Sequence, residues 1–254
     1  MIDLKYYSKN LRSKYLGHNI ITYEEVESTN NTASGKSFPP NTVVVADQQK
    51  HGKGRCGRKW FSPPDGNLYF SIILDHEKYN NLLEINYITC FALCESLNLF
   101  LNCKIKWPND ILANYKKIAG ILIDTKFSGS KIDKIIIGVG INIGSKGFPP
   151  EISSHATSIY LETGQIIEKE DILLEFLPRC EHFLTLNKEK KIHLSKIWEK
   201  YSAYFGKQIL IRNKNSYETF IEKGLSDNGD FIVETCSGEF KNLTIGEIAY
   251  DTCT

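Results

Sequence analysis

A glycine- and cation-rich stretch at residues 52–60 holds the side chains best suited to chemistry. It reads Gly-Lys-Gly-Arg-Cys-Gly-Arg-Lys-Trp, so four cations and three glycines lie within nine residues. Glycines let the backbone approach a ligand closely, and clustered cations suit a polyanion such as a nucleotide triphosphate. A solvated hairpin tip would show the same composition, because charged loops are common on protein surfaces.

The glycine spacing in this stretch, Gly52-x-Gly54-x-x-Gly57, also fits a dinucleotide-binding fingerprint. That fingerprint acts only when a helix follows at once, because the helix N-terminus holds the pyrophosphate. Residues 60–67 read Trp-Phe-Ser-Pro-Pro-Asp-Gly-Asn, and their two prolines and glycine oppose a helix. The sequence therefore argues against a Rossmann site here.

Polar side chains also collect where predicted strands end. These candidate ligand-binding residues are Ser28, Thr29, Gln49, Asn109, Asp110, Lys117 and Asn142. Polar groups gathered around an apolar sheet are typical of a ligand pocket, and Gly120 inside a strand indicates a close approach by a ligand or backbone. Each residue alone also has a structural interpretation, such as a helix N-cap for Ser28, a turn for Pro108-Asn109-Asp110 or a solvated cation for Lys117.

Alternating and β-branched runs predict the strands that must position these residues. The predicted strands span residues 20–26, 42–45, 68–74, 104–107, 116–124 and 135–144, and apolar residues at helical spacing predict helices over 82–101 and 169–186. Beyond residue 206 only short strands are predicted, at 208–211, 217–221, 231–234 and 245–248, with a hairpin signal at Asn228-Gly229. Such closely spaced strands suggest a small β-barrel.

Bulk properties restrict the class of protein. The 254 residues suffice for one large domain with or without a small one. A net charge of +1 argues against a protein that binds nucleic acid or a membrane surface through overall charge. The 7 cysteines lie partly in apolar runs and no signal peptide is recognisable, which indicates a reduced cytoplasmic protein. The 6 histidines show no metal-binding spacing.

Six blocks, in order along the chain, resemble the signature motifs of biotin protein ligases. They lie at residues 27–30 (Glu-Ser-Thr-Asn), 49–68 around the basic stretch, 106–111 (Lys-Trp-Pro-Asn-Asp-Ile), 117–122 (Lys-Ile-Ala-Gly-Ile-Leu), 138–142 (Gly-Val-Gly-Ile-Asn) and 156–159 (Ala-Thr-Ser-Ile). Gly246-Glu247-Ile248 near the end of the chain also fits. The resemblance thus covers about residues 20–250, and the order of the blocks makes it specific.

The resemblance implies an α/β (α+β) catalytic domain similar to class II aminoacyl-tRNA synthetases at residues 1–205. A small SH3-like C-terminal domain would follow at residues 206–254. It also implies two reactions. Biotin and ATP first give biotinyl-5′-AMP and pyrophosphate, with Mg²⁺ as the metal. The adenylate then acylates a lysine of a biotin carboxyl carrier domain, as in acetyl-CoA carboxylase.

Site roles also follow from the resemblance. Biotin would be bound by Ser28, Thr29, Asn30, Gln49, Lys53, Gly54, Arg55, Lys117 and Gly120. ATP would be bound by Arg55, Arg58, Trp60, Asn109, Lys117 and Asn142. Lys117, Arg55 and Asp110 would be catalytic, with Lys117 and Arg55 neutralising the carboxylate and acyl-phosphate and Asp110 assisting deprotonation of the target lysine. The residues of any metal site stay unknown.

The chain departs from the family pattern in three places. Lys53 replaces a usual arginine and so loses bidentate geometry, Cys56 replaces a second arginine, and Asp251 stands where some members carry a cation. About 20 residues precede the first strand, too few for the helix-turn-helix repressor domain of some members, so we expect no nucleic-acid partner. A homodimer is compatible with the resemblance. The alternatives are a lipoate or octanoate ligase or transferase of the same fold, and a non-catalytic biotin-sensing protein.

Overall fold

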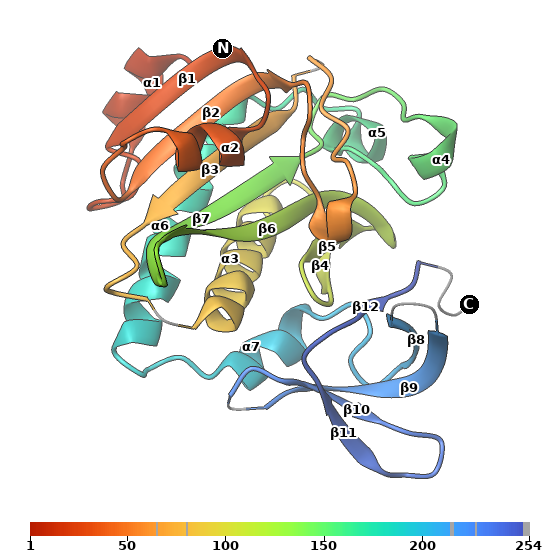
Figure 1. The fold of residues 1–254 in the computed structure, drawn as a ribbon. Helices are drawn as coiled ribbons and strands as arrows, with labels where there is room; N and C mark the ends of the chain where they lie inside the picture. Colours follow the sequence, from red (N-terminus) through yellow and green to blue (C-terminus); the bar gives the residue numbers. More distant parts are fainter. Residues whose placement is uncertain (65, 80, 214–215, 227, 251–254) are drawn as a thin grey trace.

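The chain is built around a seven-stranded sheet (Figure 1). The structure is a computed structural model and describes residues 1–250 except 65, 80, 214–215 and 227. The strand order is β1-β2-β3-β7-β6-β5-β4, with β1 and β2 parallel and the other pairs antiparallel. Its strands are β1 (Asn19–Val26), β2 (Thr42–Gln49), β3 (Leu68–Leu74), β4 (Cys103–Lys106), β5 (Asp110–Ala113), β6 (Lys116–Ser128) and β7 (Lys131–Ile141).

The centre of this sheet is apolar on both faces. Strand β3 is buried along its whole length, and β2 over its first five residues, as expected for continuous apolar runs. Gly120 of β6 pairs with Gly140 of β7. Because neither residue carries a side chain, these paired glycines leave room above one face of the sheet.

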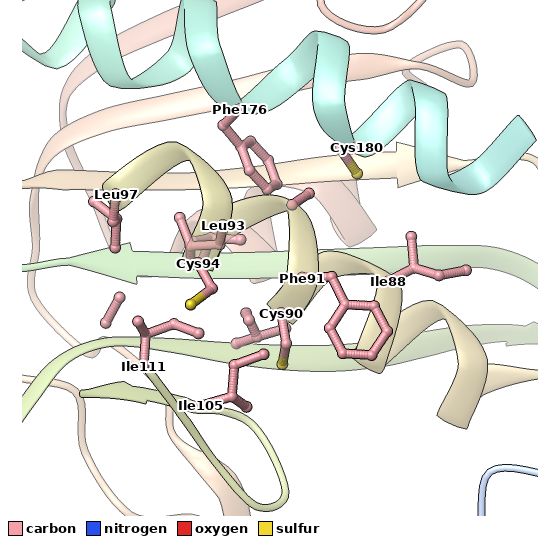
Figure 2. Packing of buried hydrophobic residues seen from close by; sticks show 14 of the residues in the cluster. Ile88, Cys90, Phe91, Leu93, Cys94, Leu97, Ile105, Ile111, Phe176 and Cys180 are labelled. Atoms are coloured by element: carbon pink, nitrogen blue, oxygen red, sulfur yellow. The ribbon is translucent and has the colours of Figure 1, made fainter. Parts of the chain in front are cut away.

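Two long helices cover the other face. Strands β4, β5 and β6 pack against α3 (Leu82–Leu97), and α6 (Lys169–Lys188) packs against α3. Phe176 of α6 also lies edge-on against Phe70 of β3. Figure 2 shows Phe176 and Cys180 of α6 above Leu93 of α3, with Ile105 and Ile111 of the sheet below. Helix α3 is apolar around most of its circumference because it is enclosed on both sides. The face with the glycines carries the short α2 (Thr29–Gly35), which packs on β2, β3 and β7.

A second, five-stranded sheet follows, in the order β11-β10-β9-β8-β12. Its strands are β8 (Gln208–Asn213), β9 (Ser216–Leu225), β10 (Phe231–Glu234), β11 (Phe240–Leu243) and β12 (Glu247–Ile248). Trp107, next to the large sheet, stacks on Phe231 of β10 with ring centroids 4.5 Å apart. The apolar core therefore runs from one sheet into the other, and the proposed division at residue 206 stays a prediction.

Four further helices complete the described chain. They are α1 (Leu4–Asn10), α4 (Pro150–Ser153), α5 (Ile159–Thr163) and α7 (Leu194–Tyr201). Helix α7 lies between the two sheets, where Trp198 packs edge-on against Phe231. None of the described helices is long and apolar enough to cross a membrane.

The predicted fold class, α/β with a small C-terminal β unit, is confirmed. The predicted strands and both long helices are present with shifted ends; the helix predicted over 82–101 ends at Leu97. The sequence analysis missed β5, β11 and the helices α4, α5 and α7. Asp110, interpreted as part of a turn, begins β5 and pairs with Gly120 of β6.

Candidate active site

A cavity of about 170 Å³ opens over the glycine-bearing face of the large sheet. Gly120, Gly138 and Gly140 form its floor, and the indole of Trp60 lies directly on this floor. A Cβ atom added at Gly140 would come within 2.4 Å of the Trp60 ring, and one at Gly120 within 2.9 Å. The two glycines are therefore required for the position of the Trp60 indole.

One end of the cavity is a network of uncharged polar side chains. The Thr29 amide donates to Gln49 Oε1 at 2.9 Å, and Gln49 Nε2 donates to the Ser62 hydroxyl at 3.0 Å. The buried Ser71 hydroxyl donates to Asn30 Oδ1 at 2.6 Å and lies 2.8 Å from the Thr29 hydroxyl. These bonds fix the start of α2 against the end of β2 and the middle of β3.

Asn30 and Ser28 line the same end of the cavity, here called the neutral end. Asn30 Nδ2 donates to Asp124 Oδ2 of β6 at 2.7 Å, which fixes the amide of Asn30 over Gly138. Ser28 occupies the N-cap position of α2, yet its side chain makes no capping hydrogen bond and lines the cavity instead. The N-cap interpretation therefore does not account for the Ser28 hydroxyl.

The basic stretch forms a closed hairpin over the cavity, here called the basic loop (residues 52–60). The Gly54 amide donates to the Arg58 carbonyl at 2.7 Å, and the Trp60 amide donates to the Gly52 carbonyl at 2.8 Å. At the tip, Arg55–Gly57 forms a single 3₁₀ turn in which Cys56 has φ +54°. Cys56 is exposed and does not line the cavity, whereas all four cations of the basic loop do.

Three side-chain contacts attach the basic loop to the rest of the molecule. Lys53 Nζ donates to Asn31 Oδ1 of α2 at 2.6 Å, and Arg55 donates to Asn109 Oδ1 at 3.3 Å. Arg58 forms an ion pair with Glu247 of β12 at 2.5 Å. The basic loop thus bridges the large sheet and the small sheet.

The other end of the cavity, here called the charged end, is centred on Asp110. Lys117 Nζ lies 2.5 Å from Asp110 Oδ1, and Lys106 Nζ lies 3.3 Å from Asp110 Oδ2. The Tyr250 hydroxyl donates to Asp110 Oδ2 at 2.5 Å. Burial opposes ionisation of Asp110, but the two ammonium groups outweigh burial and hold the pKa of Asp110 well below its ordinary value. Asp110 is therefore a carboxylate at neutral pH.

Two asparagines hold this end of the cavity together. Asn109 accepts from Arg55 and donates to the Ile121 carbonyl. Asn142 donates to the Thr157 carbonyl at 2.9 Å, which connects the end of β7 to the segment before α5. Both asparagines face the cavity with part of their side chains.

Beside the cavity, one buried polar atom has no hydrogen-bond partner within the described part of the chain. The Trp60 Nε1 atom is buried beside the cavity and finds no hydrogen-bond acceptor among the described residues. A buried N–H group without an acceptor is costly. A ligand that supplies an acceptor oxygen or nitrogen at this point would remove that cost.

All residues predicted to bind biotin or ATP, together with Asp110, line this one cavity. The sequence analysis missed Ser71, Lys106, His155 and Tyr250, as well as Asp124. A serine within the apolar run of β3 was the signal for Ser71. Asp251, one of the departures noted above, lies outside the described residues. Among the described residues, no group of three or more His, Cys, Asp or Glu side chains could hold a metal ion.

Known proteins resemble this chain over most of its length. Residues 23–142 match the biotin/lipoate A/B protein ligase family. The chain is 31% identical over 242 residues to the bifunctional ligase/repressor BirA of Bacillus spizizenii, covering 90% of this chain and 73% of the relative. It is 28% identical over 204 residues to the biotin–[acetyl-CoA-carboxylase] ligase of Paracoccus denitrificans, covering 77% and 85% of the two chains.

The fold agrees with these matches. The biotin protein ligase of Aquifex aeolicus, solved in complex with biotin and ATP, superposes with a TM-score of 0.81. That protein is 32% identical to this chain, and the match covers 91% of this chain and 98% of the Aquifex chain. On this evidence, the chain belongs to the biotin protein ligases of the biotin/lipoate A/B protein ligase family.

Proposed function

We propose that this protein is an ATP-dependent biotin–protein ligase. The observation that carries the proposal is the division of a single cavity into a neutral end and a charged end that is rich in cations. Biotin has the same division, with an uncharged ureido ring at one end and a carboxylate at the other. A ligand bound along the glycine floor would therefore present its carboxylate to Lys117 and Arg55.

In the first step, a biotin carboxylate oxygen attacks the α-phosphorus of ATP. The new bond gives biotinyl-5′-AMP, and the bond to the β-phosphate oxygen breaks to release pyrophosphate. The two reactants are both anions, so their repulsion raises the barrier. We assign Lys117 and Arg55 to neutralising the reacting oxygens, Arg58 to the remaining negative charge of the nucleotide, and Lys53 to biotin.

The neutral end selects the ring. Ser28, Thr29, Asn30 and Gln49 offer hydroxyl and amide groups that suit the carbonyl and N–H groups of a ureido ring. We assign Gly54 and Gly120 to close backbone approach, and Trp60 to stacking on the adenylate and donating its unpartnered Nε1–H to it. Asn109 and Asn142 would border the nucleotide.

In the second step, the amine of the target lysine attacks the acyl carbon of biotinyl-5′-AMP. An amide forms and AMP leaves with the electrons of the acyl–oxygen bond. Asp110 as the group that takes the lysine proton stays a prediction. Its low pKa and its two ammonium partners favour a second role, in which Asp110 holds Lys117 in place.

Mg²⁺ would arrive with ATP. Mg²⁺ is commonly bound by substrate phosphates with one or two carboxylates. Asp110 is the only acidic side chain among the described residues that line the cavity, and its carboxylate already serves Lys106, Lys117 and Tyr250. The described residues therefore do not form a resident metal site, and triphosphate oxygens would be the main ligands.

A lipoate or octanoate ligase would share this fold, but its substrates differ at the neutral end. A dithiolane ring or an alkyl chain has no N–H or carbonyl group to satisfy Gln49, Thr29 and Asn30. Such a ligand would displace water from these polar groups without hydrogen-bonding to them, which weakens its binding relative to biotin. We therefore expect discrimination in favour of biotin.

The decisive assay is biotin-dependent exchange of labelled pyrophosphate into ATP. We expect exchange with biotin and none above background with lipoic or octanoic acid. Exchange driven by lipoic acid instead of biotin would replace this function with that of a lipoate ligase. Binding of biotin without any exchange would favour a biotin sensor.

The remaining partners are also proposals. We propose that the acceptor is a biotin carboxyl carrier domain, that the protein works in the cytoplasm, and that it has no nucleic-acid partner, in keeping with its net charge of +1. Transfer of labelled biotin to a purified carrier domain tests the acceptor, and a gel shift at physiological salt tests nucleic-acid binding. Light scattering with and without biotin and ATP tests whether the protein forms a homodimer.

A further inference from the structure

The last described residue of the chain reaches into the cavity from the small sheet. Tyr250 follows β12, yet its ring lies against the imidazole of His155, with centroids 4.7 Å apart. The ammonium of Lys106 lies 4.0 Å from the centre of the same ring. Lys106 also donates to the Ile248 carbonyl at 2.8 Å, so a buried cation fixes the backbone just before Tyr250.

The two carboxylate oxygens of Asp110 have different partners. Oδ2 receives the Tyr250 hydroxyl and faces Lys106, while Oδ1 is left for Lys117. Burial, followed by the nearby Asp110 charge, raises the pKa of Tyr250 well above its ordinary value, so the hydroxyl stays protonated and donates. Without this bond, Lys106 at 3.3 Å would be the remaining partner of Oδ2 among the described residues, and the carboxylate could rotate.

We propose that Tyr250 is a positioning residue for the adenylation step, acting through Asp110 to hold the ammonium of Lys117 against the reacting oxygens. The small sheet would thereby complete the charged end of the cavity. This inference rests on the proposed function, because Lys117 contributes to adenylation only if the protein activates biotin. The neutral end does not contact Tyr250, so the affinity for the biotin ring should not depend on it.

The test is Tyr250→Phe, which keeps the ring on His155 and removes only the hydroxyl. Loss of a hydrogen bond to a charged group predicts a roughly tenfold to hundredfold lower kcat for biotin-dependent pyrophosphate exchange. The KM for biotin should stay within about twofold of wild type, because the bond acts on Lys117 and not on the ring. Tyr6→Phe is the matched control, because the exposed Tyr6 hydroxyl donates to Asp171 at 3.1 Å far from the cavity.

A second readout does not depend on turnover. Lys117 labelling by an amine-acylating reagent, followed by mass spectrometry, reports how firmly Asp110 holds the ammonium. We expect several-fold faster labelling of Lys117 in Tyr250→Phe and no change in Tyr6→Phe. Unchanged labelling and unchanged kcat, or a loss confined to the KM for biotin, would overturn the inference. If wild type shows no exchange, the proposed function fails, and labelling alone then decides the role of Tyr250.

Discussion

The two ends of the cavity are built in different ways. The neutral end comes from α2 and the strands beneath it, β2 and β3, and most of its hydrogen bonds join uncharged side chains. The charged end is assembled from the consecutive strands β5 and β6, the basic loop and the segment after β12, which are three separate parts of the sequence. The neutral end is thus formed once the large sheet folds, whereas the charged end also needs the small sheet to dock.

This difference suggests a division of work. A preformed hydrogen-bonding pocket suits recognition of a neutral ring, because its groups lose little freedom on binding. Opposing charges held by several elements suit stabilisation of charge that develops during the reaction. Changes at the neutral end should therefore alter affinity for biotin, and changes at the charged end should alter the rate of adenylation.

We expect the largest loss of activity when Lys117, the ammonium paired with Asp110 Oδ1, is removed. We expect Lys117→Ala to lose two or more orders of magnitude in the rate of pyrophosphate exchange, as for other electrostatic stabilisers. Lys116→Ala, an exposed neighbour on the same strand, is the control and should retain the wild-type rate. A rate near wild type in Lys117→Ala would show that Lys117 does not take part in adenylation.

Filling the shared floor should affect both ends together. In Gly140→Ala, the new Cβ would lie 2.4 Å from the Trp60 ring, so the indole must leave its place. Overpacking of this kind costs about 1–3 kcal/mol, which predicts a roughly fivefold to hundredfold weaker affinity for biotin by calorimetry. At Gly147, a Cβ would have no heavy atom within 4 Å, so Gly147→Ala should bind normally. Equal affinities in the two variants would contradict the packing of Trp60 on the floor.

The docking of the small sheet gives a pH-dependent comparison. Glu222 of β9 is fully buried and accepts from Trp198 Nε1 at 2.7 Å and from the Ser202 hydroxyl at 2.5 Å. Burial raises the pKa of Glu222 from the ordinary 4.5 to about 7. The folded protein therefore keeps this proton to a higher pH than the unfolded chain does. The resulting stability is complete below pH 4.5 and is lost as the pH rises to about 7.

We expect the free energy of unfolding of the wild type to fall by about 2 kcal/mol between pH 5 and pH 8 relative to Glu222→Gln. Denaturant unfolding at the two pH values measures this difference. Glu218→Gln, an exposed change on the same strand, should follow the wild type. Parallel curves for wild type and Glu222→Gln would show that Glu222 titrates alike in both states.

Some residues of the cavity could be predicted from the sequence and others could not. The basic loop, Lys117 and the strand-end residues could be found because glycine and polar side chains interrupt apolar runs at those points. Tyr250 could not be found, because its contact with Asp110 joins residues 140 positions apart and depends on how the small sheet docks. Helix α7 did carry a signal in the spacing of Leu194, Trp198 and Tyr201, which all face the core.

Short elements were the other weak point. Strand β5 has only four residues and follows a proline, so local pattern favoured a turn at Asp110. Pairing with β6 outweighs that preference and brings Asp110 beside Lys117. Tertiary pairing, which no local window contains, therefore decides the geometry of the charged end.

The division between the two ends is tested most directly by pyrophosphate exchange as a function of biotin concentration. Gln49→Leu and Lys117→Ala are compared with wild type. Loss of the Gln49 bonds to Thr29 and Ser62 should raise the KM for biotin about tenfold or more, and excess biotin should restore most of the rate. Saturating biotin should not restore Lys117→Ala. Rescue of both variants by biotin, or of neither, would contradict the assignment of binding to one end of the cavity and chemistry to the other.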